Sequence, residues 1–151
     1  MILDETAEFA DAVALNTGGA GTYNVGDIMD LGSARNIGAG RTAFLCVQVD
    51  TTATSGGSAT GQFQLVSDST SSIATDGSQT IHAITDAIPK ASLTAGFQVA
   101  IAIPPQMDVA YERYLGVQQV TGTAAFTAGK INAFITYDPP ADFVAMPDAT
   151  N

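Results

Sequence analysis

The chain has 151 residues, the length of one domain, and a formal net charge of −10 at pH 7. Only 13% of the residues are charged, and two lysines and three glutamates are too few for the exposed faces of a helical bundle. The acidic balance argues against nucleic acid and anionic membranes as partners, because both attract clustered lysine and arginine. We also expect synthesis in the cytoplasm, because the N-terminus lacks the basic region of a signal peptide.

Residues 1–26 are predicted to form an N-terminal arm and loop. Apolar residues alternate irregularly with acids at the start of the chain, and the spacing of Phe9 and Val13 fits one or two helical turns. An extended arm fits this pattern equally well. The Gly- and Thr-rich stretch from Asn16 to Gly26 is typical of a loop.

Residues 27–138 are predicted to form an all-β domain, followed by a C-terminal tail over residues 139–151. Alternation of apolar and polar residues is clearest where Phe63 and Leu65 face one side and Gln62 and Gln64 the other. Seven or eight strands with long loops indicate a two-sheet antiparallel β-sandwich or jelly roll. The predicted strands are Asp27–Leu31, Thr42–Asp50, Gly61–Asp68, Gln79–Thr85, Gly96–Ile103, Glu112–Val120 and Gly129–Tyr137.

Catalytic and metal-binding motifs are weak throughout the sequence, so we expect neither enzyme activity nor a cofactor. His82 is the only histidine and no Gly-x-Ser-x-Gly elbow is present. Cys46, the only cysteine, lies within a predicted strand and is expected to be a buried thiol. The acidic pairs in the loops lack the spacing of a calcium-binding loop; these are Asp27 with Asp30, and Asp68 with Asp76.

Basic residues are rare enough that each arginine is a candidate interface residue. Arg35 and Arg41 flank a Gly-rich turn, whereas Arg113 follows Glu112 in a pattern typical of an exposed ion pair. The edge strands of a sandwich also favour a homo-oligomer, either a dimer or a trimer.

Several segments together resemble the jelly-roll capsid cement, or decoration, proteins of short-tailed double-stranded DNA bacteriophages. The resemblance extends from Met1 to about Asp138, and the stretch DLGSARNIG combined with TAGK is its most specific part. The segments that carry it are residues 1–4, 28–38, 47–50, 91–96, 112–115 and 126–134.

This resemblance implies a structural protein of the virion, without enzyme activity. Such a protein lies on the outer surface of the icosahedral capsid and bridges neighbouring major capsid proteins with the HK97-like fold. It thereby stabilises the shell against the pressure of the packaged DNA.

Apolar residues near the two termini are the first candidates for contact with the capsid or with another copy. We name Ile2, Leu3 and Phe9 near the start, and Tyr137 and Phe143 near the end. Packing of these residues on their own domain is an equally good interpretation. A glycan-binding module is the competing function; it would use aromatic platforms such as Tyr111 or Tyr114.

Overall fold

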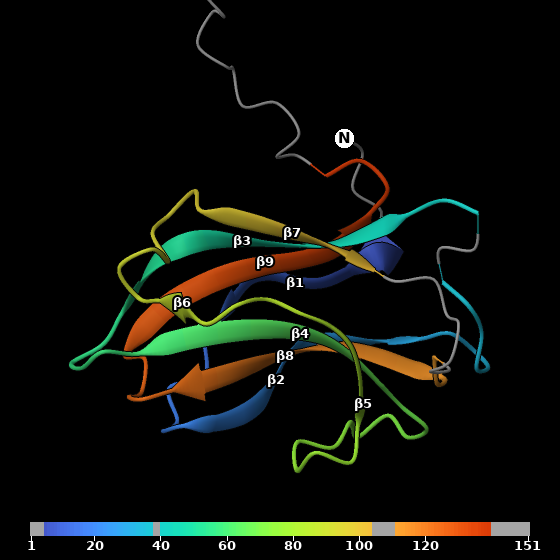
Figure 1. Ribbon diagram of the computed structural model, residues 1–151, viewed down its shortest axis with the longest axis horizontal. Helices are drawn as coiled ribbons and strands as arrows, with labels where there is room; N and C mark the ends of the chain where they lie inside the picture. Colours follow the sequence, from blue (N-terminus) through green and yellow to red (C-terminus); the bar gives the residue numbers. More distant parts are fainter. Residues whose placement is uncertain (1–4, 38–39, 104–110, 140–151) are drawn as a thin grey trace, which may run out of the picture.

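A computed structural model describes residues 5–37, 40–103 and 111–139. Within these ranges, antiparallel strands form two sheets that pack face to face (Figure 1). Sheet A has the order β1 (Glu8–Ala14), β9 (Ala128–Thr136), β3 (Ala43–Thr54) and β7 (Gln98–Ile103). Sheet B has the order β2 (Gly21–Asp30), β8 (Tyr114–Gly122), β4 (Thr60–Asp68) and β5 (Thr80–Ile84), and the short β6 (Ile88–Pro89) pairs with β4. A single 3₁₀ turn, η1 (Glu5–Ala7), precedes β1.

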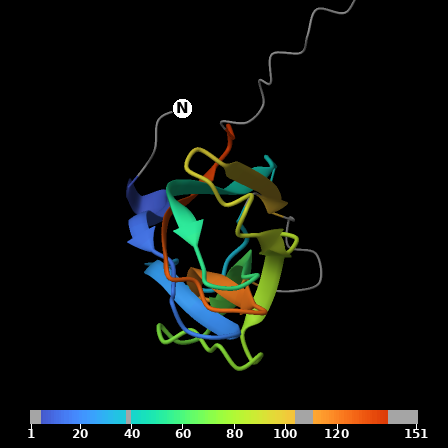
Figure 2. The ribbon, with the colours of Figure 1, turned by 90° about the vertical axis from the view of Figure 1, so that its left-hand side faces the viewer.

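The strand order is that of a jelly roll, so the predicted fold class is confirmed. Strands β1 to β4 alternate between the two sheets, and β7, β8 and β9 then return along the same path in reverse. The first strand therefore pairs with the last, and β2 pairs with β8. Figure 2 shows the ribbon from one end, with the two sheets facing each other.

The core consists of the inward side chains of both sheets. Phe63 and Leu65 are among them, as the alternation predicted, with exposed fractions of 1% and 0%. Cys46 is also buried, as expected. The remaining large core residues come from all the long strands and include Leu45, Val47, Ile103, Leu115, Val117 and Ile131.

The predicted N-terminal arm and loop over residues 1–26 is wrong for its described part, because the β-domain already begins with β1. Phe9 is 1% exposed and belongs to the core. Ala12 adopts a positive φ of 48°, and its backbone N–H donates to Oδ1 of Asn132 at 2.6 Å. This irregularity breaks the alternation of β1. Gly26, with φ +71°, has the same effect in β2.

The connection between β4 and β5 covers part of the outer face of sheet B. Asn24, Gln118 and Gln64 form a row across three paired strands. Nε2 of Gln118 donates to Oδ1 of Asn24 and to the carbonyl of Ala74, while its Oε1 accepts from Gln64 and Gln79. Gln118 is fully buried because this connection lies over it. Gln64 points away from the core, as the alternation predicted, and it is buried beneath the same connection.

Candidate interaction surface

An apolar groove of about 360 Å³ lies at one end of the sandwich. It forms where η1, the last residues of β2, the loop of residues 31–37 and the end of β9 meet. Figure 1 shows η1 and the end of β9 at this same end of the molecule. Among its lining residues, Tyr137 is 49% exposed. We call this feature the terminal groove; it is lined by Thr6, Ala7, Met29, Leu31, Ile37, Ile135, Thr136 and Tyr137.

The structure brings the three predicted arginines to the end of the molecule that carries the terminal groove. The guanidinium carbon of Arg41 lies 5.1 Å from the centroid of the Tyr137 ring, within the range of a cation–π contact. Arg35 is exposed on the loop whose ends, Leu31 and Ile37, line the groove. These arginines are three of the five basic residues in the chain, and the charge of Arg113 is balanced by Asp30.

Arg113 anchors the loop of residues 31–37. Its Nε and Nη2 donate to Oδ1 and Oδ2 of Asp30, each at 2.8 Å. This bidentate pair holds the pKa of Asp30 down at about 2, and the same contact raises the pKa of Arg113. The backbone N–H of Leu31 donates to the carbonyl of Arg113, and that of Gly32 to Asp30. The loop therefore leaves β2 in a fixed geometry.

The sequence-based interpretation of Arg113 as the partner of its neighbour Glu112 is wrong. The partner is Asp30, which is remote in sequence and becomes adjacent only because β2 pairs with β8. Glu112 instead accepts a hydrogen bond from the hydroxyl of Thr80 at 3.0 Å.

The remaining predicted contact residues divide into two groups. Phe9 was proposed as an arm residue that contacts the capsid, but its ring is buried between the sheets, so this prediction is wrong. Ile2, Leu3 and Phe143 lie outside the described residues.

His82 takes part in a structural contact. The backbone N–H of Glu112 donates to Oγ of Ser67, and this hydroxyl lies 2.7 Å from Nε2 of His82. The hydroxyl and the imidazole therefore share a hydrogen bond. Burial lowers the pKa of His82 to about 4. Ser67 is 0% exposed, so its hydroxyl is enclosed by the fold.

Tyr111 is unsuited to the role of a sugar platform. Its ring stacks on His82 with 3.9 Å between the centroids, and the residue is 1% exposed. Burial also raises the pKa of the Tyr111 hydroxyl to about 12. The interpretation of Tyr111 as a glycan-stacking residue is therefore wrong, because a sugar needs an accessible ring face.

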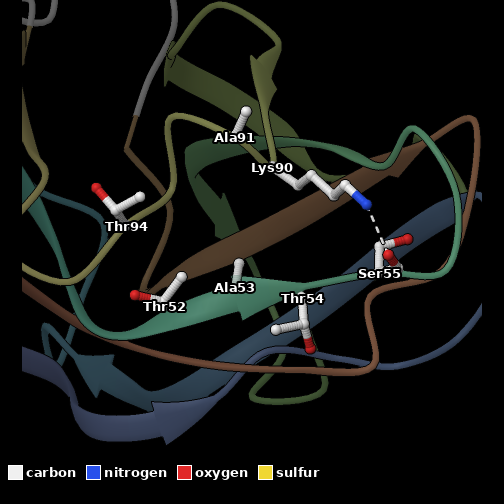
Figure 3. A pocket seen from close by; sticks show the side chains of 7 residues that line it. All are labelled: Thr52, Ala53, Thr54, Ser55, Lys90, Ala91 and Thr94. Atoms are coloured by element: carbon white, nitrogen blue, oxygen red, sulfur yellow. Dashed lines mark hydrogen bonds between the residues drawn. The ribbon is translucent and has the colours of Figure 1, made fainter.

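A second hollow, of about 300 Å³, opens on sheet A (Figure 3). Nζ of Lys90 reaches across it and donates to the carbonyl of Ser55 at 2.6 Å. The other lining residues carry hydroxyl groups or small side chains: Thr52, Ala53, Thr54, Ala91 and Thr94. This lining offers hydrogen bonds but contains no aromatic ring.

Asp68 and Asp76 are engaged with the backbone of their own loop, whereas Asp30 of the other predicted acidic pair binds Arg113. Asp68 accepts from the N–H groups of Thr70 and Ala74, and Asp76 accepts from Ser78, which lowers the pKa of both carboxyls. In the described part of the chain, no group of three or more His, Cys, Asp or Glu residues is arranged to hold a metal ion.

Two exposed isoleucines on the edge strand β5 were not identified as surface residues from the sequence. Ile81 pairs with Val66 and Ala83 with Leu65, so His82 is an extra residue in this strand. This bulge places Ile81 and Ile84 on the outer face of sheet B, each 47% exposed. Their spacing of three residues would put them on opposite faces of a regular strand, so alternation alone gives no signal for this pair.

Comparisons with known proteins give one family and no close curated relative. Among the described residues, no helix is long and apolar enough to cross a membrane. A search of curated proteins finds no match. The family model Bbp16 matches residues 9–135, from the second residue of β1 to the penultimate residue of β9. Since this match covers most of the 151 residues, the chain belongs to the Bbp16 family.

Proposed function

We propose that this protein is a bacteriophage capsid cement protein. It binds the outer surface of the icosahedral shell, bridges neighbouring HK97-like major capsid proteins and stabilises the DNA-filled head. The observation that carries the proposal is the terminal groove with Arg35 and Arg41 beside it. The exposed loop of residues 31–37 borders this groove, and the ion pair between Arg113 and Asp30 fixes its start. The loop belongs to the most specific segment of the sequence resemblance.

The chemistry of this end suits contact with another protein. Apolar side chains in the groove gain free energy when a partner covers them, at about 25 cal/mol for each Å² of apolar surface. Arginine forks bind carboxylates and are enriched in protein interfaces. Arg41 and Arg35 are exposed, whereas Arg113 is already paired with Asp30. Arg35, Arg41 and Tyr137 are therefore the residues that we assign to the contact.

The net charge supports attachment to the outside of the shell. A protein with a charge of −10 is repelled by packaged DNA, so the outer surface is the favourable side. Each copy needs to bury only a modest area on two or more capsid subunits. Many copies then add up to a large stabilisation, because a departing subunit must break several contacts at once.

Co-sedimentation with expanded capsids from which the protein has been stripped tests the proposal. We expect saturable binding to the shell and no binding to unassembled capsid protein, because the binding site spans subunits. The double variant R35Q/R41Q should bind the shell at least tenfold more weakly, because it loses two charged contacts. The matched control K90Q/K130Q also changes the net charge from −10 to −12 but alters residues away from the terminal groove.

Binding of a glycan is the alternative outcome. The hydroxyl-lined hollow around Lys90 is the feature that favours it, although its lining lacks the aromatic ring that sugar sites commonly use. Binding on a glycan array that K90Q abolishes and R35Q/R41Q leaves intact, together with failure to bind shells, would overturn the cement proposal.

A further inference from the structure

We propose that the terminal groove is a peptide-binding site whose occupant is the C-terminal segment of the same chain, with the Phe143 ring seated among the apolar lining residues. This segment, residues 140–151, lies outside the described residues. The inference does not rest on the capsid role: it concerns the free protein, and a shell that contacts the groove would displace the segment.

The groove presents apolar surface that an occupant would cover. Met29, Leu31, Ile37 and Ile135 contribute to its walls, and Tyr137 closes one side while remaining about half exposed. A volume of about 360 Å³ accommodates an aromatic side chain together with part of its backbone. Seating an apolar residue there removes its surface and that of the groove from water.

The course of the chain brings the C-terminal segment to the groove. Strand β9 ends at Thr136, and both Thr136 and Tyr137 line the groove. Phe143 follows Tyr137 by six residues, which span at most about 20 Å when extended. Pro139 lacks the N–H that a further ladder bond would need, so the strand is not continued past Tyr137, which lines the groove.

Charge complementarity selects this segment over the N-terminal one. Residues 140–151 contain no lysine or arginine, and Asp142 and Asp148 flank the apolar residues Phe143, Val144 and Met146. Arg41 lies over the Tyr137 ring at the groove, in reach of a carboxylate that accompanies Phe143. The N-terminal rival, residues 1–4, carries Ile2 and Leu3 but no aromatic ring and a single acid.

Tryptophan fluorescence tests the proposal, because the natural chain contains no tryptophan. In the full-length variant F143W, we expect blue-shifted emission that acrylamide quenches weakly. The matched control A149W places the same reporter farther along the segment, past the apolar residues, and should show the emission and quenching of a solvent-exposed indole.

Two second-site variants locate the contact. In the F143W background, I37D places a charge in the groove and should lower the ratio of docked to undocked segment roughly tenfold or more. The emission then approaches that of A149W. R41E changes only an exposed side chain, so it tests the same contact without the risk of misfolding, and it should also increase the quenching.

Four results would overturn the proposal. Equal quenching of F143W and A149W would mean that Phe143 is not docked. Shielding that survives both I37D and R41E would place the ring elsewhere. Shielding that disappears on dilution would assign the groove to the segment of a second copy. Shielding of an I2W reporter, with F143W exposed, would assign it to the N-terminal segment.

Discussion

Replacement of Phe9 by alanine is the most direct test of where the domain begins. The ring is 1% exposed and is part of the core, in a strand that pairs only with β9 within sheet A. Truncation of a buried phenylalanine removes its transfer free energy and leaves a cavity, which costs about 3–5 kcal/mol. This is a large part of the roughly 5–15 kcal/mol by which a domain is stable.

Thermal and urea unfolding, followed by circular dichroism, measure this loss. Since 1 kcal/mol shifts the melting temperature by about 2–4 °C at this size, Phe9→Ala should lower it by roughly 6–20 °C. Tyr137→Ala is the matched control, because it removes another predicted contact aromatic that is half exposed, and it should cost less than about 1 kcal/mol. A loss below about 1 kcal/mol for Phe9→Ala would refute the packing of β1 described here.

Three further substitutions test other parts of the fold. For His82, whose pKa falls from 6.5 to about 4 on folding, the unfolded chain binds more protons between these values. The free energy of unfolding should therefore decrease by about 1–2 kcal/mol as the pH falls from 6.5 to 4, after allowance for partial exposure of the ring, and this part of the pH dependence should vanish in His82→Gln. Gly26→Ala should prevent folding or reduce stability by more than about 2 kcal/mol in urea unfolding, because φ is +71° and the added Cβ would collide with the carbonyl oxygen of Phe9. Gln118→Leu leaves four hydrogen-bonding groups without their partner and should cost about 3 kcal/mol, with faster hydrogen exchange in the connection between β4 and β5.

The central strands are predictable from the sequence because their alternation is regular. Predicted Gly61–Asp68 corresponds to β4 (Thr60–Asp68), and predicted Gly129–Tyr137 corresponds to β9 (Ala128–Thr136). In both strands one face contacts the core along its whole length, so apolar residues recur at every second position. The strand β1 was missed, and β2 (Gly21–Asp30) was predicted only over its second half, as Asp27–Leu31, because Ala12 and Gly26 adopt positive φ and interrupt that patterning.

The candidate surface was predictable only in part. The scarcity of basic residues singled out Arg35 and Arg41, and the structure brings both to the end with the terminal groove. The groove itself depends on contacts between η1, the β2 end and β9, which are remote in sequence. The bond between Arg113 and Asp30 likewise spans 83 residues and follows from strand pairing.

A thermal melt of stripped, expanded capsids with and without the purified protein tests the cement function most directly. The account predicts saturable binding and a higher melting temperature of the shell, an effect that R35Q/R41Q reduces strongly and the charge-matched K90Q/K130Q does not. An unchanged melting temperature of the shell at saturating protein, or equal stabilisation by the two double variants, would contradict it.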